Sequence, residues 1–212
     1  MGVLPTSRTE AQHLVVAWLA LALAVALLFA NPFRRGGVSL VSFGAVFVVS
    51  LVTAGSGFLL HEIAHKVVAQ RYGYWAEFRA DYEMLAIAVL GAAAVGFLFA
   101  APGAVRIRSQ RGRGISERHS GLISVAGPVT NIVLFVVFFG VSLFFGGIVG
   151  YIGEFGAFIN AFLAAFNMVP YGPLDGAKVL RWSRQAFAVV FGLGVALVLY
   201  EFGVVDTLVG TL

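Results

Sequence analysis

Cysteine is absent from this chain of 212 residues, and charged residues make up only 11% of it. Without cysteine there is neither a disulfide bond nor a thiolate metal site, so any metal must be held by His, Asp or Glu. A soluble domain carries about 25% charged residues, so the low charged fraction argues against an ordinary soluble domain. The net charge of +4 is then better explained as an orientation signal in a membrane protein than as a nucleic-acid-binding surface.

Hydrophobic residues form 60% of the chain and gather into uncharged runs. Because about 20 apolar residues cross a bilayer and backbone groups in lipid must bond to one another, we expect these runs to be helices. The predicted fold class is an all-α polytopic membrane protein with about five to six transmembrane helices. The runs are His13–Ala30, Gly36–Leu60, Met84–Ala101, Ser120–Gly153, Phe155–Leu174 and Ala186–Val205.

Two short segments near 74–80 and 101–108 alternate between apolar and polar residues, which predicts strands. They follow a helix that carries the motif HEIAH, and they could pair into a small membrane-associated β-element. No repeat and no linker interrupts the chain, so residues 1–212 are predicted to form a single integral-membrane domain. The predicted core is about 38–185, with a peripheral first span at 13–30 and a peripheral last span at 186–205.

The strongest local motif is His61-Glu62-Ile63-Ala64-His65, at the C-terminal end of an apolar run. On a helix, positions i and i+4 share one face, so the two imidazoles can bind a single Zn²⁺. The Glu after the first His can then reach the water at the metal as a general base. Ionisable residues beside an apolar span are costly and usually functional. The alternative is that both His are polar caps at the membrane interface.

A catalytic zinc needs a third protein ligand and one open position. The candidate is Asp175, within the segment Asn167–Gly176 (NMVPYGPLDG). Pro170 and Pro173 keep this segment from forming a regular helix. Irregular backbone at membrane depth is tolerated where it is buried in protein or lines a wet cavity. Taken alone, Asp175 is better explained as an ordinary exposed loop residue.

HExxH at the end of one span and NxxPxxPLDG at the end of a later one together resemble the site-2 protease family of intramembrane zinc metalloproteases. The resemblance covers about 38–185 and is to a compact prokaryotic form without PDZ or CBS domains. A third stretch, Ala126–Asn131, resembles the family's AGPxxN. The other matching positions are His61, Glu62 and His65 in the first motif, Asn167, Pro170, Pro173, Leu174, Asp175 and Gly176 in the second, and Asn160 before it.

The resemblance implies one Zn²⁺ per chain, held by His61, His65 and Asp175, with Glu62 as general base. It also suggests that Asn131, and Asn167 in the second motif, hold the substrate or the developing oxyanion. The implied activity is hydrolysis of peptide bonds within or near transmembrane segments of membrane-protein substrates, as in regulated intramembrane proteolysis. Two alternatives stay open: a non-catalytic zinc-binding membrane scaffold and a metal transporter.

The charge pattern bears on whether the candidate ligands meet at one depth. If they do, the segments 70–83 and 104–119 lie at the same face, and Met84–Ala101 enters the membrane and returns. The alternative is a full sixth span. With re-entry, every basic residue except Arg34 and Arg35 lies at one face, which the positive-inside rule makes cytoplasmic. We therefore expect a plasma-membrane protein whose active site lies within the membrane near the cytoplasmic face. The sequence specifies neither the substrate nor the oligomeric state.

Overall fold

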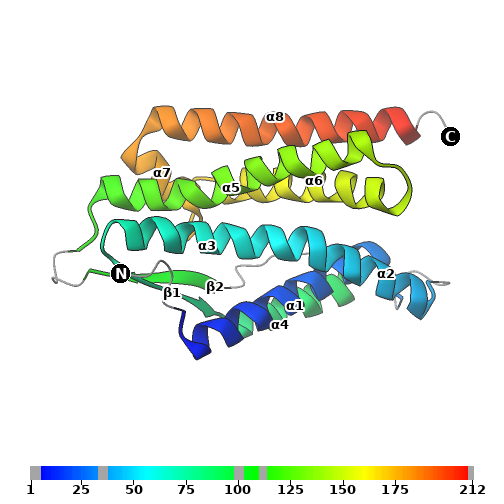
Figure 1. The fold of residues 1–212 in the computed structure, drawn as a ribbon, viewed down its shortest axis with the longest axis horizontal. Coiled ribbons are helices and arrows are strands. Elements are labelled where there is room, and N and C mark those ends of the chain that lie inside the picture. The colour runs from blue at the N-terminus through cyan, green and yellow to red at the C-terminus, as the bar shows by residue number, and fades with distance from the viewer. Residues whose placement is uncertain (1–5, 33–37, 98–102, 110–113, 210–212) are drawn as a thin grey trace.

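The computed structural model describes residues 6–32, 38–97, 103–109 and 114–209, with side chains described as far as Gly203. Its long helices lie side by side in layers, with α1 and α4 along one side, α3, α5 and α6 in the middle, and α8 along the other (Figure 1). The elements are α1 (Arg8–Ala30), α2 (Leu40–Ser50), the π-helical segment η1 (Leu51–Gly55), α3 (Ser56–Arg71), β1 (Trp75–Ala80), α4 (Tyr82–Ala94), β2 (Gly103–Arg108), α5 (Glu117–Phe144), α6 (Gly147–Asn167), α7 (Asp175–Trp182) and α8 (Arg184–Val209).

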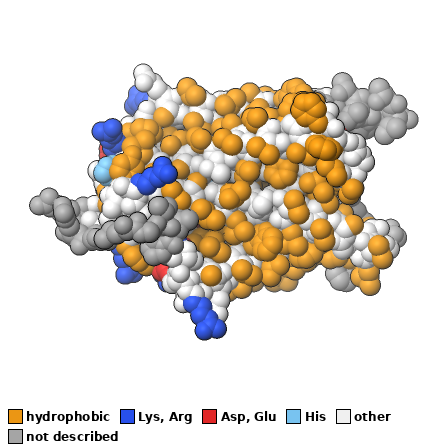
Figure 2. Space-filling model, in the orientation of Figure 1, with side chains coloured by type: hydrophobic (Ala, Val, Ile, Leu, Met, Phe, Trp, Pro, Cys, Tyr) orange, Lys and Arg blue, Asp and Glu red, His pale blue; other side chains and the backbone are white. Residues whose placement is uncertain are grey.

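Within the described ranges, 5 helical segments are long and apolar enough to cross a membrane. They are α1, the continuous rod of α2, η1 and α3, and then α5, α6 and α8. This confirms the predicted all-α polytopic fold, and the chain is a multi-pass membrane protein. On the face shown in Figure 2, apolar side chains cover the middle of the molecule broadly, as lipid contact requires, while Lys and Arg gather at one end.

The second span contains a π-helical segment that its sequence does not predict. At η1 the helical ladder shifts, and Trp18 of α1 donates a hydrogen bond from Nε1 to the carbonyl oxygen of Leu51 at 3.0 Å. Single π-helical turns leave a carbonyl for such an outside partner and are frequent near functional sites. Because α3 follows η1 directly, the shift and the Trp18 contact set the rotation of the helix that carries HEIAH.

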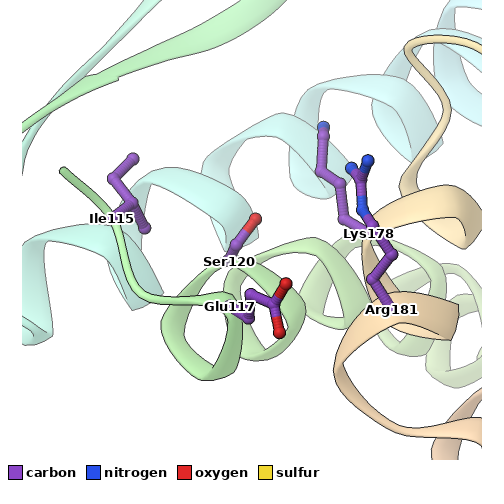
Figure 3. Close-up of a pocket in the computed structure, with 5 residues that line it drawn as sticks. All are labelled: Ile115, Glu117, Ser120, Lys178 and Arg181. Carbon is purple, nitrogen blue, oxygen red and sulfur yellow. The ribbon is translucent and has the colours of Figure 1, made fainter.

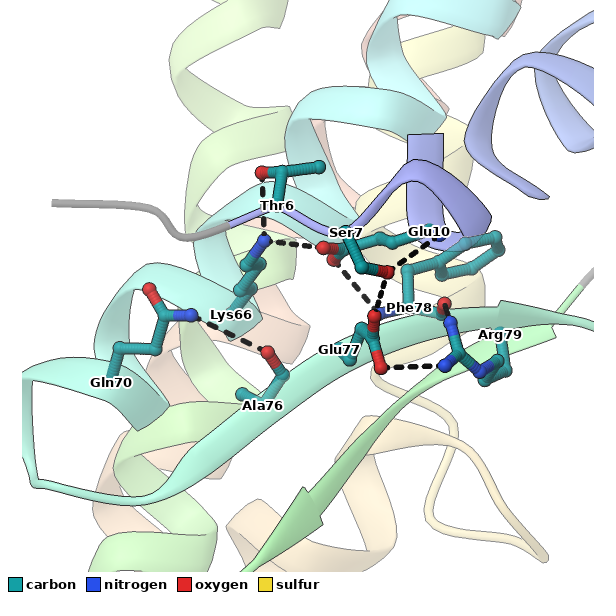
Figure 4. A network of polar contacts seen from close by, with 9 residues as sticks. All are labelled: Thr6, Ser7, Glu10, Lys66, Gln70, Ala76, Glu77, Phe78 and Arg79. Carbon is teal, nitrogen blue, oxygen red and sulfur yellow. Dashed lines mark hydrogen bonds and ion pairs between the residues drawn. The ribbon is translucent and has the colours of Figure 1, made fainter. Parts of the chain in front are cut away.

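The two predicted strands are present and pair antiparallel, from Trp75 opposite Arg108 to Ala80 opposite Gly103. Residues 101 and 102 of the predicted second strand lie outside the described residues. The outer edge of β1 is covered by α1, because the backbone N–H of Phe78 donates to Glu10 at 3.0 Å and that of Ala80 donates to His13 at 3.0 Å. Figure 4 shows Glu10 facing β1 from the start of α1.

The chain between the two strands leaves the sheet and returns to it. Because Ala80 and Gly103 face each other in the ladder, the intervening segment begins and ends at one place. Its helix α4 has 13 residues, which is shorter than the roughly 20 needed to cross a bilayer. It packs on α1 through small residues, with Ala88 and Ala92 against Ala24 and Leu27. This arrangement fits re-entry of Met84–Ala101 rather than a sixth span, although residues 98–102 lie outside the described part.

The boundary between α5 and α6 differs from the predicted one. The expected runs Ser120–Gly153 and Phe155–Leu174 placed the turn at Glu154, but the helices separate at Phe145–Gly147 instead. Gly147 has φ of +61°, a conformation that glycine adopts without steric cost. Glu154 lies exposed inside α6. The prediction was wrong because a single exposed carboxylate does not end a helix, whereas the glycine pair allows the sharp turn.

Candidate metal centre

The two histidines of HEIAH lie on successive turns of α3 and face the interior of the helical bundle. His61 is 4% exposed and His65 is 7% exposed. Their Nε2 atoms are 3.0 Å apart. The i, i+4 spacing therefore places both imidazoles on one buried face, as the motif predicts on a helix.

Asp175 reaches the histidines although it follows His65 by more than a hundred positions in the sequence. It is the first residue of α7, and this short helix packs against α5. Its Oδ2 lies 3.2 Å from Nε2 of His61 and 3.0 Å from Nε2 of His65. Asp175 is 7% exposed, so the three side chains form one buried cluster.

The other ring nitrogen of each histidine is also engaged. Nδ1 of His61 lies 2.6 Å from Oδ1 of Asn131, and Nδ1 of His65 lies 2.7 Å from the carbonyl oxygen of Ile123. Both partners are acceptors, so each Nδ1 carries the proton and each Nε2 is left with a lone pair toward the cluster. This is the usual arrangement of metal-binding histidines, in which the outer hydrogen bond fixes the tautomer and the ring orientation.

Asn131 belongs to a buried chain of amides that crosses three helices. It is fully buried on α5, and its Nδ2 donates to the carbonyl oxygen of Gly57 at 3.2 Å and to Oδ1 of Asn160 at 2.9 Å. Asn160 on α6 donates in turn to the carbonyl oxygen of Gly156 at 2.8 Å. These hydrogen-bonded amides thus connect α6 through α5 to His61 on α3.

These contacts do not suit the expected roles of the two asparagines at the substrate or oxyanion. The donors of Asn131 are occupied by Gly57 and Asn160, and its oxygen faces His61. The amide of Asn167 donates to the carbonyl oxygen of Leu163 within its own helix at 3.0 Å. In this structure Asn131 contacts a candidate metal ligand, and among the described residues Asn167 makes no hydrogen bond to the cluster.

The cluster fits a zinc ion by its donors and by the room beside them. Within the described ranges, the only group of at least three His, Cys, Asp or Glu with metal-binding geometry is His61, His65 and Asp175, whose ligand atoms lie within 4.8 Å of one another. Three protein ligands with an open fourth position is the pattern of catalytic zinc. A Cβ added to Gly127 would come within 2.5 Å of Nε2 of both histidines. Glycine at this position therefore keeps α5 close while leaving space at the ligand atoms.

Glu62 lies beside the cluster rather than in it. It is 8% exposed, and its carboxylate interacts with the backbone of Val105 on β2. The backbone N–H groups of Phe78 and Ala80 point away from β2 and bond to α1. Val105 is paired with Phe78 in the antiparallel ladder. The backbone N–H and C=O of Val105 therefore point away from β1. The outer edge of β2 therefore runs past Glu62.

One further ionisable group borders the cluster and was not predicted from the sequence. Lys178 lies one turn after Asp175 on α7, with Nζ 3.7 Å from Oδ1 of that residue. It also lines a cavity of about 220 Å³ with Ile115, Glu117, Ser120 and Arg181. Figure 3 shows Lys178 and Arg181 leaving α7 on the side that faces Glu117 and Ser120 of α5. The i, i+3 spacing from Asp175, which places two residues on one face of a helix, was the sequence feature that could have predicted Lys178 beside the cluster.

The fold and the cluster together define a multi-pass membrane protein with a candidate metal site inside its helical bundle. Comparison with curated proteins identifies its family. The chain is 43% identical over 170 residues to the protein named "Putative zinc metalloprotease MJ0611" of Methanocaldococcus jannaschii, a match that covers 79% of this chain and 83% of the relative. This chain belongs to that family of zinc metalloproteases, in agreement with its resemblance to the site-2 protease family.

More distant relatives carry the same kind of name. The chain is 28% identical over 215 residues to "Putative zinc metalloprotease Rip3" of Mycobacterium tuberculosis, covering 94% of this chain and 49% of the relative. It is 24% identical over 181 residues to "Zinc metalloprotease MJ0392" of M. jannaschii, covering 80% of this chain and 47% of the relative. The chain thus spans about half the length of these two proteins. No family model and no solved structure matches it.

Proposed function

We propose that this metalloprotease is an intramembrane zinc endopeptidase that hydrolyses peptide bonds within or near transmembrane segments of membrane-protein substrates, as in regulated intramembrane proteolysis. The observation that carries the proposal is the burial of His61, His65 and Asp175 among helices long enough to span a membrane. A protease whose ligands lie within its own spanning helices meets substrates that share the bilayer. Its partners are therefore a transmembrane protein and the surrounding lipid, with no nucleic acid.

Glu62 is the proposed general base. One Zn²⁺, when held by His61, His65 and Asp175, polarises the scissile carbonyl and makes water more acidic. Glu62 accepts a proton from the attacking water, whose oxygen bonds to the carbonyl carbon. As the C–N bond breaks, Glu62 delivers that proton to the leaving amine nitrogen, so protons balance and the carboxylate is restored. Its place one residue after His61, beside β2, keeps it at the edge of the cluster that substrate must approach.

The outer edge of β2 is the proposed docking line for substrate. Peptide bonds in a helix are shielded by their own hydrogen bonds, so the substrate segment must unwind before attack. An extended segment can then add to a sheet edge through backbone hydrogen bonds. Because α1 covers the edge of β1 while the edge of β2 passes Glu62, this sheet offers such an edge at the cluster. Substrates with Gly, Pro or polar residues in the middle of the span are expected.

The proposed location is the plasma membrane, with the active site near the cytoplasmic face. The described Lys and Arg side chains gather at the end of the molecule where α3 ends, α5 begins and α7 lies (Figure 2). The same end holds β1 and β2, so the predicted orientation signal and the sheet lie together. The cluster is then close to cytoplasmic water while still enclosed by spanning helices.

The test is to purify the full chain in detergent as wild type, Glu62→Gln, Asp175→Ala and the control Glu154→Gln, and to measure bound zinc and cleavage of a single-span protein with a central Asn-Pro. We expect Glu62→Gln to keep zinc and lose about 10²–10⁴-fold in cleavage rate. Asp175→Ala should lose both, and exposed Glu154→Gln neither.

Two results would replace this proposal. Full activity in zinc-loaded Glu62→Gln would exclude Glu62 as the base. Equal zinc in every form, with no cleavage by any of them, would favour a non-catalytic zinc-binding scaffold. A metal transporter is disfavoured by the position of the ligands, since a transported ion needs polar groups through the whole width of the membrane.

A further inference from the structure

Peptide hydrolysis places negative charge on the carbonyl oxygen, and enzymes provide preorganised donors where that charge develops. The two asparagines expected to supply such a donor are engaged elsewhere. Asn131 is fully buried and donates to Gly57 and Asn160, and Asn167 donates to Leu163. Neither asparagine is therefore placed to donate a hydrogen bond to the oxyanion of the proposed reaction.

Lys178 is a cation at the edge of the cluster. Its Nζ lies 3.7 Å from Oδ1 of Asp175, the oxygen that does not face the histidines. That distance exceeds the reach of a hydrogen bond. The side chain is 38% exposed and lines the cavity between α7 and α5, so the ammonium has room to move toward a substrate.

Arg181 provides the internal comparison. It lies one turn farther along α7 and lines the same cavity (Figure 3). Of these two cations, only Lys178 pairs with a member of the cluster in the described structure, and its charge also acts on Glu62. General attraction of anions to the cavity would involve both residues, whereas a contact with a group at the cluster would involve Lys178 alone.

We propose that Lys178 is a further catalytic residue whose ammonium group donates a hydrogen bond to the carbonyl oxygen of the scissile peptide. This inference rests on the proposed protease function. When the water oxygen bonds to the carbonyl carbon, the C=O electron pair moves onto the oxygen beside Lys178, and it returns when the C–N bond breaks. Lys178 stays protonated throughout, so its contribution is electrostatic and the proton account of Glu62 is unchanged.

The test uses an oxyanion probe that needs no proteolysis. The full chain in detergent is loaded with Co²⁺, and acetate is titrated while the visible absorption of the metal is followed. We expect Lys178→Met to retain Co²⁺ and to bind acetate about tenfold or more weakly, the loss of one charge-assisted hydrogen bond. Lys178→Arg should keep most of the affinity, and Arg181→Met all of it. With the single-span substrate, kcat of Lys178→Met should fall about 100-fold at unchanged KM.

Each contrary result has its own meaning. Loss of Co²⁺ from Lys178→Met would make Lys178 a partner of Asp175 and overturn the inference. Equal weakening of acetate binding in Lys178→Met and Arg181→Met would show only a general attraction of anions by the two cations. Unchanged acetate binding and kcat in Lys178→Met would show that Lys178 does not contact the carbonyl oxygen. By contrast, a wild type that binds metal and acetate through Lys178 but cleaves nothing would overturn the proposed function and not the contact.

Discussion

Each histidine of the cluster is held through the ring nitrogen that faces away from it. His61 is held by a side chain, Asn131, and His65 by a backbone carbonyl, that of Ile123. Pro128 lies on the same helix α5, and because proline lacks an N–H, it gives no helical hydrogen bond to the carbonyl oxygen of Ser124, the residue after Ile123. The AGP stretch therefore combines three features. Helix α5 approaches α3 closely at Gly127, Pro128 interrupts the hydrogen bonds of the helix, and Asn131 follows about one turn later.

Asn131→Ala tests this orienting role. Removing the acceptor leaves Nδ1 of buried His61 without its partner, and loss of such an outer contact typically lowers metal affinity 10–100-fold. We expect zinc to be lost at correspondingly lower chelator concentration, measured by competition with a chromophoric chelator. Asn131→Asp, which keeps an acceptor, should retain more affinity. Asn167→Ala is the matched control and should bind zinc as the wild type does. Unchanged affinity in Asn131→Ala would show that the amide chain does not position His61.

At the scale of elements, the start of α1 is fastened to both α3 and β1 by buried ionic groups. Glu10 is fully buried, with Oε2 2.6 Å from Nζ of Lys66 on α3 and Oε1 accepting from Phe78 of β1 (Figure 4). Lys66 directly follows His65, and Trp18 of the same helix bonds to η1. Helix α1 therefore fixes the position of the sheet relative to the helix that carries the candidate ligands.

Glu10→Gln should destabilise the protein strongly. It leaves the Lys66 ammonium buried beside a neutral amide, and removing one partner of a buried pair costs about 3–5 kcal/mol. We expect a large fall in thermal unfolding midpoint in detergent. The double change Glu10→Gln with Lys66→Met should recover much of the loss, because it removes both charges of the buried pair while the amide oxygen can still accept from Phe78. If the double variant were as unstable as Glu10→Gln, packing rather than the ion pair would explain the effect.

At the scale of the whole molecule, charge and topology place the cluster toward one end. The sheet, the C-terminal end of α3 and the start of α5 lie at that end, while the start of α2 and the turn between α5 and α6 lie at the other (Figure 1). The adjacency of Ala80 and Gly103 returns the chain to the sheet after α4. The basic residues before and after this segment therefore lie at the same end of the molecule, rather than being divided between the two membrane faces.

Single cysteines can test this topology cleanly, since the chain has none of its own. In intact cells a membrane-impermeant maleimide should label Ser39→Cys and Gly146→Cys, which are exposed at one end. It should label Arg71→Cys and Arg108→Cys, exposed at the other end, only after permeabilisation. Labelling of all four in denatured samples is the control for reactivity. If Arg108→Cys reacted from outside while Arg71→Cys did not, the segment after β1 would cross the membrane and re-entry would be wrong.

The sequence by itself determined the features that depend on local backbone geometry. Helical periodicity places His61 and His65 on one face, alternation predicts the two strands, and apolar runs predict the spans, because each pattern is set by neighbours in the chain. The charge pattern further indicated that Met84–Ala101 returns. The sequence did not predict the position of the turn between α5 and α6, because Glu154 interrupts the uncharged run but lies exposed inside α6.

Only the tertiary structure decided which distant groups meet. It brought Asp175 to the histidines by packing α7 on α5, and engaged Asn131 with His61 and Asn160. It also set Lys178 beside the cluster and α1 against the sheet. These outcomes depend on contacts between segments far apart in the chain, and the periodicity of any one segment carries no information about its partner. The candidate ligands could thus be named from motifs, while the groups that orient them became visible only when the helices were packed together.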